Sequence, residues 1–133
     1  MSENEIPKEV KDFVFQYIDS VEQLEILLLL NAEPHKVWTV GEVHQTLRSN
    51  MSSVEKRLNL LAAQKLIDKK EGGFQFKPEG SEKNEIIRQL SGAYKVHRHR
   101  IFEMIFSPMK KARDIAEAFV IAPPKDPKGD SNG

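Results

Sequence analysis

The 133-residue sequence contains no cysteine. This absence excludes disulfide bonds, thiolate nucleophiles and cysteine-ligated zinc sites. Long apolar runs are also missing, because the longest one, residues 26–30, is far too short to cross a bilayer. The first twenty residues are acidic and lack the basic and apolar parts of a signal peptide, so we expect a cytoplasmic protein without a membrane segment.

Sequence signatures of catalysis are absent as well. There is no glycine-rich phosphate loop, no Gly-x-Ser-x-Gly elbow, no His-Glu-x-x-His pair and no pair of carboxylates in an apolar setting. His97 and His99 are two residues apart, so on a helix they point to different sides. We therefore expect no enzyme, no metal site and no cofactor.

Charge is balanced overall but uneven along the chain. Twenty basic and twenty acidic residues give a net charge of zero. Residues 1–34 carry two basic and eight acidic side chains, whereas residues 35–80 and 81–122 each carry eight basic and five acidic ones. This acidic head on a basic body permits an anionic partner without requiring one.

Three helix starts are predicted from capping boxes, in which a Ser or Thr oxygen and a Glu or Gln three residues later bind each other's free backbone N–H groups. The pairs are Ser20 with Gln23, Thr39 with Glu42, and Ser52 with Glu55. They predict helices over residues 21–31, 40–48 and 52–64. The first of these is apolar on almost all sides, which is typical of a helix at the centre of a fold or at a subunit interface.

Apolar periodicity predicts three further helices. The first is an amphipathic helix over residues 10–18, which follows Pro7. The second is a long helix over residues 81–106, stopped by Ser107 and Pro108, and the third continues to Phe119.

A short strand and a hairpin complete the pattern. Residues 37–39 are β-prone and predict a brief strand. Residues 66–77 form two extended runs around Gly72 and Gly73, which predicts a tight hairpin with both glycines in its turn, because the favoured turn needs two positive φ angles. The fold class is therefore mainly α with a small β-hairpin.

This order of elements is that of a winged helix-turn-helix domain. The segments that carry it are Thr39-Val-Gly-Glu-Val-His-Gln-Thr-Leu, Met51-Ser-Ser-Val-Glu-Lys-Arg-Leu-Asn-Leu-Leu and Lys65-Leu-Ile-Asp-Lys-Lys-Glu-Gly-Gly-Phe-Gln-Phe. They resemble the DNA-reading core of winged-helix regulators, and the flanking helices make the chain most similar to the MarR-like group. The resemblance covers residues 39–77, and it implies a DNA-binding transcriptional regulator. The family pattern usually has a glycine, which ends the preceding helix in a left-handed conformation, where this chain has Lys65.

Together, the element pattern, the composition and the resemblance predict four parts along the chain. Residues 1–36 form N-terminal helices that contribute partly to dimerisation, and residues 37–78 form the helix-turn-helix and the wing. Residues 79–122 form C-terminal dimerisation helices, and residues 123–133 form a disordered tail of polar residues, glycine and proline.

The candidate DNA-binding residues lie on the second helix of the motif and on the wing. The helix over 52–64 is expected in the major groove, where hydroxyl, ammonium and amide groups contact phosphates and base edges, and the wing over 67–77 on the adjacent backbone. The residues are Ser52, Ser53, Lys56, Asn59, Lys69, Lys70, Gln75 and Lys77. The simpler interpretations are a solvated helix face, and lysines that keep a sheet edge from aggregating. The alternative function is a winged-helix module that binds a protein and no DNA, which fits the acidic head and the zero net charge.

A homodimer is predicted because the flanking helices carry more apolar surface than one small domain needs. Its expected contact residues are Phe13, Tyr17, Leu90, Tyr94, Ile101, Met104 and Phe119. The alternative is that the C-terminal helices fold back and cover the first helix within one chain.

Two features near these helices allow more than one interpretation. Regulators of this type often bind a small-molecule effector, and Phe13, Tyr17, Trp38 and Tyr94 could line its space, although such aromatic residues more often form core and the sequence identifies no ligand. In the basic run over residues 95–100, we expect His97 to pack in the apolar seam. Arg98 and Arg100 then face solvent or pair with the acidic head.

Overall fold

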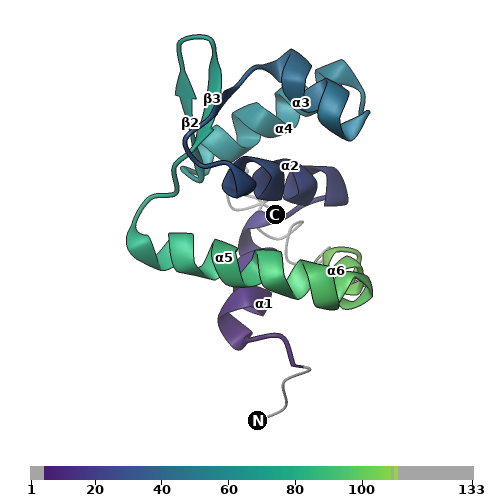
Figure 1. Ribbon diagram of the computed structural model, residues 1–133. Helices are drawn as coiled ribbons and strands as arrows, with labels where there is room; N and C mark the ends of the chain where they lie inside the picture. The colour runs from purple at the N-terminus through teal and green to yellow at the C-terminus, as the bar shows by residue number, and fades with distance from the viewer. Residues whose placement is uncertain (1–4, 109, 111–133) are drawn as a thin grey trace, which may run out of the picture.

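The computed structural model describes residues 5–108 and residue 110. The described elements are α1 (Lys8–Tyr17), α2 (Val21–Ala32), β1 (Val37–Trp38), α3 (Val40–Leu47), α4 (Met51–Ala63), β2 (Ile67–Lys70), β3 (Gly73–Phe76), α5 (Ser81–Val96) and α6 (Arg98–Ile105). Figure 1 shows α3, α4 and the β2–β3 hairpin on one side of α2, and α1, α5 and α6 on the other. The predicted class, mainly α with a small β-hairpin wing, is confirmed.

Helix α2 lies at the centre of the fold, as its all-round apolar sequence predicted. It packs against α3, α4, α5 and β3. Leu24, Ile26, Leu27 and Leu30 are fully buried. Because α2 contacts elements on both of its sides, it joins the helix-turn-helix and wing to the flanking helices.

Of the three predicted helix caps, the one at Thr39 is confirmed as a complete capping box, in which Thr39 and Glu42 bind each other's backbone N–H groups. Ser20 caps α2 by accepting from the Gln23 N–H, while the Gln23 side chain binds elsewhere. The box at Ser52 was wrong: α4 begins one residue earlier, and Asn50 Oδ1 accepts from the Ser53 N–H at 3.0 Å. Asparagine caps helices as well as serine does and comes first along the chain.

The wing is part of a three-stranded antiparallel sheet of order β1-β3-β2. Lys70 pairs with Gly73, so Glu71 and Gly72 form the turn and the prediction that both glycines lie in it was wrong. Gly72 has a φ of 89°, which suits glycine. Gly73 is needed for another reason, because a Cβ there would lie 2.2 Å from the backbone oxygen of Trp38 in the neighbouring strand.

Trp38, the only tryptophan, lies in β1 and is 4% exposed. The Lys36 ammonium lies 4.2 Å from the centre of its ring. The indole N–H has no hydrogen-bond partner among the described residues. Trp38 therefore belongs to the core beneath the wing rather than to an effector pocket.

Lys65 ends α4 with a φ of 64°, at the position where the family pattern has glycine. The Lys65 N–H donates to the Ala62 oxygen and the Leu66 N–H to the Leu61 oxygen. These two bonds form a Schellman motif with lysine as its left-handed residue. The chain therefore keeps the usual helix end and bears the steric strain of a lysine there.

Lys65→Gly is expected to stabilise the chain by up to about 1 kcal/mol. Removing the left-handed strain, about 1–2 kcal/mol, outweighs the extra backbone entropy of glycine in the unfolded chain, about 0.5–1 kcal/mol. Lys65 is exposed, so no packing is lost. Urea unfolding measures the gain, and Lys65→Ala serves as the control because alanine keeps the strain. An equal effect of both substitutions would contradict the explanation.

The predicted helix over residues 81–106 is in fact two helices, because the chain breaks between α5 and α6 at His97, where φ is −123° and ψ is 42°. The break directs α6 against α1 and buries Ile101 and Ile105. His97 is half-buried at this corner rather than packed in a continuous seam.

A polar cluster at the same corner fastens it to α2. The Tyr94 hydroxyl donates to Glu25 Oε2 at 2.9 Å, and Arg98 lies 3.9 Å from the same carboxylate oxygen. Burial, followed by the hydrogen bond to Glu25, raises the pKa of Tyr94. Of the two outcomes expected for Arg98, solvent exposure or pairing with the acidic head, the structure shows the pairing, with the side chain still 62% exposed.

The residues predicted to form a dimer are largely covered by the chain itself. Phe13, Leu90, Tyr94 and Ile101 are buried, and Tyr17 and Met104 are partly buried against the core. Helix α1 packs against both α5 and α6. The four buried side chains therefore do not offer contact surface to a second copy. Phe119 and the predicted tail over 123–133 lie outside the described residues.

Within the described part of the chain, no helix is long and apolar enough to cross a membrane.

Candidate nucleic-acid interface

Helix α4 presents the predicted polar face to solvent. Ser52, Lys56 and Asn59 are exposed. On the opposite side, Val54, Leu58 and Leu61 are buried in the core. Because residues four and seven positions apart share one side of a helix, the three polar residues form one stripe along α4.

Ser53 does not belong to this stripe. Its hydroxyl donates to Glu22 Oε1 of α2, and the residue is only partly exposed. A side chain turned toward α2 in this way is not available to a partner at the solvent side of α4. Its predicted role as a DNA contact therefore has no support in the geometry.

The wing brings a cation to the same stripe. Lys69, Lys70 and Lys77 are exposed. Lys69 Nζ lies 3.4 Å from Asn59 Oδ1, which joins the wing to α4. Lys70 Nζ is paired with Asp68 at 3.6 Å. Gln75 points to the β1 side, where it donates to the Pro34 oxygen at 3.2 Å, and so lies apart from the stripe.

The sequence analysis missed a further member of the stripe, Glu55. It was assigned to a capping box, but because α4 begins at Met51 it is an exposed residue beyond the first turn. Glu55 lies three residues after Ser52 and four before Asn59, on the same side of the helix. We call Ser52, Glu55, Lys56 and Asn59 the outer face of α4.

Glu22 of α2 holds the N-terminal half of α4. In addition to the hydrogen bond from Ser53, its Oε1 accepts from Arg57 Nε at 3.3 Å. Glu22 and Arg57 are both largely covered, with side chains 20% and 26% exposed. A shielded carboxylate with two donors fixes this half of the helix to the centre of the fold.

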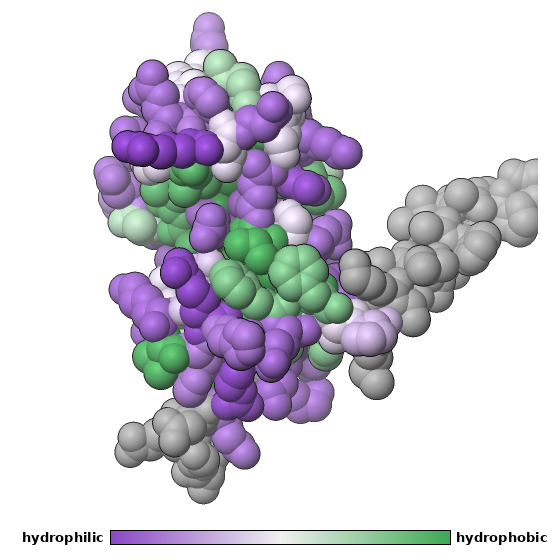
Figure 2. All heavy atoms as spheres, turned by 90° about the vertical axis from the view of Figure 1, so that its right-hand side faces the viewer, coloured by the Kyte–Doolittle hydropathy of each residue, from purple (hydrophilic) through white to green (hydrophobic). Residues whose placement is uncertain are grey.

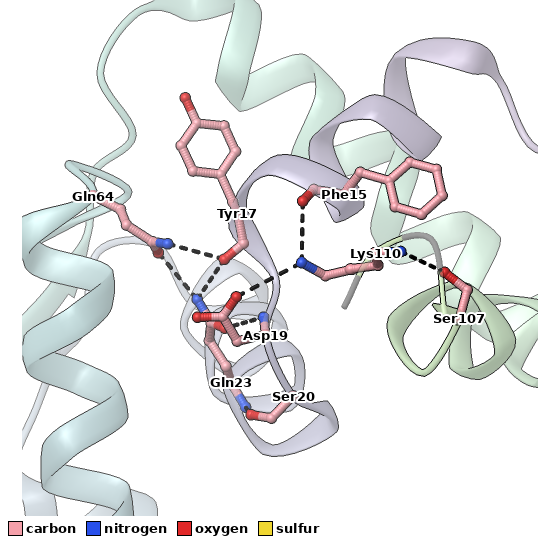
Figure 3. Close-up of polar contacts among 8 residues, drawn as sticks. All are labelled: Phe15, Tyr17, Asp19, Ser20, Gln23, Gln64, Ser107 and Lys110. Carbon is pink, nitrogen blue, oxygen red and sulfur yellow. Dashed lines mark hydrogen bonds and ion pairs between the residues drawn. The ribbon is translucent and has the colours of Figure 1, made fainter. Parts of the chain in front are cut away.

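Two glutamines hold the C-terminal end of α4 (Figure 3). The backbone oxygen of Tyr17, at the end of α1, accepts from Gln23 Nε2 at 2.8 Å and from Gln64 Nε2 at 2.9 Å. Gln23 Nε2 also lies 3.0 Å from Gln64 Oε1, and Gln23 Oε1 accepts from the Asp19 N–H at 2.6 Å. Gln64 follows the last residue of α4, so this cluster positions the outer face relative to α1.

A buried lysine reaches the same end of α1 from the C-terminal side. Lys110 is 1% exposed, and its Nζ donates to the Phe15 oxygen at 3.0 Å and lies 3.7 Å from Asp19 Oδ1 (Figure 3). Carbonyl groups at a helix C-terminus lack partners within the helix and attract cations. Lys110 is therefore attached to the corner between α1 and α2.

Metal binding and effector binding have little basis in the geometry of the described residues. Within the described ranges, no group of three or more His, Asp or Glu side chains could hold a metal ion. His99 has a single carboxylate neighbour, Glu103, at 3.3 Å. Phe13 and Tyr17 line an open hollow of about 290 Å³ between α1 and α5, but Trp38 and Tyr94 do not reach it. The aromatic residues thus do not converge on one effector space.

Comparison with solved structures identifies the fold. The chain is similar to a MarR family protein of Mycobacterium tuberculosis, with a TM-score of 0.51, 9% sequence identity, and coverage of 84% of this chain and 82% of that one. It is also similar to MepR, a transcription regulator of the Staphylococcus aureus multidrug efflux pump MepA, with a TM-score of 0.50, 13% identity, and coverage of 86% and 87%. No protein-family model matches the chain, and no curated protein matches it in sequence.

These similarities define a winged helix-turn-helix fold of the MarR type, with flanking helices on both sides of the helix-turn-helix and wing. The resemblance found in residues 39–77 is therefore confirmed for the fold. At such low identity the similarity extends to architecture and not to what the chain binds.

Proposed function

We propose that this chain is a DNA-binding transcriptional regulator of the winged-helix type. In this proposal α4, within residues 52–64, enters the major groove, and the wing, within residues 67–77, contacts the adjacent backbone. One observation carries it: the outer face of α4 is exposed and is joined to the wing by the contact between Lys69 and Asn59. A single surface thus offers hydroxyl, amide and ammonium groups to base edges and phosphates.

The distribution of charge supports the same orientation. Residues 35–80 carry eight basic and five acidic side chains, whereas the acidic head over residues 1–34 lies largely in α1 and α2. A protein of zero net charge can bind DNA when the positive side chains gather on the side that approaches the phosphates. We also propose a cytoplasmic location for the chain.

Lys56→Glu is expected to weaken DNA binding about tenfold or more and to lower its salt dependence. The exposed ammonium would be replaced by a carboxylate on the outer face, which removes one phosphate or base contact and adds repulsion. Fluorescence anisotropy with genomic DNA fragments at several salt concentrations measures both quantities. Lys95→Glu is the matched control, because Lys95 is exposed near the end of α5, outside α4 and the wing.

Absence of DNA binding by the unmodified chain at low salt would contradict the proposal. The second candidate is a winged-helix module that binds a protein and no DNA, which the acidic head favours. A pull-down that recovers one partner, together with absence of DNA binding, would support that module instead.

We also propose that the working form is a homodimer, because two half-sites one helical turn apart raise affinity and specificity. Because the chain itself covers Phe13, Leu90, Tyr94 and Ile101, we place the contact on exposed apolar residues instead. Val96, the last residue of α5, and Phe106, the residue after α6, are 72% and 57% exposed. Figure 2 faces the α6 end of the molecule and shows apolar side chains gathered at mid-height between hydrophilic regions. Light scattering at micromolar concentration tests this: the mass of two chains supports the dimer, and the mass of one contradicts it.

A further inference from the structure

The outer face of α4 includes one acidic side chain among groups that donate hydrogen bonds. Glu55 is exposed, and no hydrogen bond or ion pair joins it to another described residue. A carboxylate on a surface that approaches DNA is repelled by phosphates, so it weakens binding to all sequences alike. Such a residue favours binding only where it meets a hydrogen-bond donor on a base.

The wing restricts what Asn59 can offer. Its Oδ1 accepts from Lys69 Nζ at 3.4 Å, so the amide presents its NH₂ group outward as a donor. Lys56 carries an ammonium, which only donates. Lys56 and Asn59 therefore both offer donors, and Glu55 carries the carboxylate of the outer face beside them.

This arrangement of donors and acceptor fits one type of base pair in the major groove. Guanine presents two acceptors, N7 and O6, and its partner cytosine presents one donor, the N4 amino group. Adenine is read by asparagine through a pair of bonds that needs both the amide NH₂ and the amide oxygen. The Asn59 oxygen already accepts from Lys69, whereas no described residue binds the Glu55 carboxylate. Cytosine is the base whose major-groove edge presents a donor with no acceptor beside it, so a carboxylate meets no repulsion there.

We propose that Glu55 determines the sequence specificity of this face by accepting a hydrogen bond from cytosine N4. Lys56 and Asn59 donate to guanine, either in the base pair of that cytosine or in the neighbouring pair. Lys69 holds Asn59 in position through the contact with its oxygen. The inference rests on the proposed function, and it assigns the DNA partner a half-site with G·C at the position read by α4.

The experiment is selection from a random double-stranded DNA library with the full chain and two variants. The unmodified chain should enrich G·C at one position of each half-site by about tenfold over other base pairs. Glu55→Ala should reduce that preference to within about twofold while its affinity for unrelated DNA rises several-fold, because a repulsive charge is gone. Glu71→Ala is the charge-matched control: Glu71 is exposed in the wing turn, so its loss should leave the base preference unchanged.

Circular dichroism of both variants verifies that they fold, and the exposure of Glu55 and Glu71 makes a folding defect unexpected. Loss of the G·C preference in Glu55→Ala alone supports the inference. Binding to DNA with an unchanged preference in Glu55→Ala, or selection of A·T at the position read by α4, overturns the inference and leaves the proposed function standing. Failure of the unmodified chain to select any DNA overturns both.

Discussion

Leu90→Asp is expected to unfold the chain rather than to release folded monomers from a dimer. Leu90 is fully buried between α5 and the rest of the core. Truncating a buried leucine costs about 2–5 kcal/mol, and an unpaired buried carboxylate adds several more. The sum is comparable with the whole stability of a small domain, about 5–15 kcal/mol. The far-ultraviolet circular dichroism signal of the helices should therefore be largely lost.

The matched control is Val96→Asp, six residues further along. Val96 is 72% exposed, so a carboxylate there stays in water and the chain should keep its fold. If exposed Val96, at the end of α5, lies at a dimer contact, this variant should scatter light as a single chain. A Leu90→Asp protein that is folded and monomeric would instead place Leu90 between chains and contradict the packing described above.

Gln23→Leu is expected to destabilise the chain by about 3 kcal/mol, the second-largest effect. Gln23 is fully buried and makes hydrogen bonds to Tyr17, Asp19 and Gln64. Leucine has a similar size but cannot form hydrogen bonds. The Asp19 N–H would lose its acceptor, and the Tyr17 oxygen would lose one of its two donors. Each buried polar group left unsatisfied costs about 1–3 kcal/mol.

Urea unfolding of Gln23→Leu, Gln64→Leu and the double variant measures the coupling of the two glutamines. Because both donate to the same Tyr17 oxygen, their effects should deviate from additivity by about 1 kcal/mol. Gln45→Leu on the exposed side of α3 is the control and should change stability by no more than about 0.5 kcal/mol. Strictly additive effects would show that the two side chains do not act as a unit.

The architecture was predictable where local signals and packing agree. Thr39 with Glu42 marked the start of α3, and the all-round apolar run of α2 indicated its central position, because both signals depend on residues close in sequence. The break at His97 was not predictable, since no proline or glycine stands there and periodicity alone favours a continuous helix. It arises from contacts of α6 with α1, almost ninety residues earlier in the chain.

The candidate site was predictable as a face but not in its detail. Helical spacing placed Ser52, Lys56 and Asn59 on one face. By contrast, Ser53 is turned away from that face by its hydrogen bond to Glu22, a contact between two helices that the spacing does not reveal. The exposure of Glu55 on this face was missed because Glu55 was assigned to a helix cap. A serine three residues before a glutamate has the same spacing inside a helix as it has at a helix start. The one sign against that cap was Asn50, which precedes Ser52 and is an equally good capping residue.

The environment of Trp38 gives the protein a fluorescent reporter of its own. Its indole is buried, and its N–H donates to no described group, so its emission should lie toward the blue end of the range for tryptophan and shift to the red when water reaches the ring. Because β1 pairs with β3 and Gly73 lies against the Trp38 backbone, detachment of the wing would expose this ring even if the helices stayed folded. Comparing the emission wavelength with the helical dichroism signal during unfolding would thus distinguish opening of the wing from loss of the whole fold.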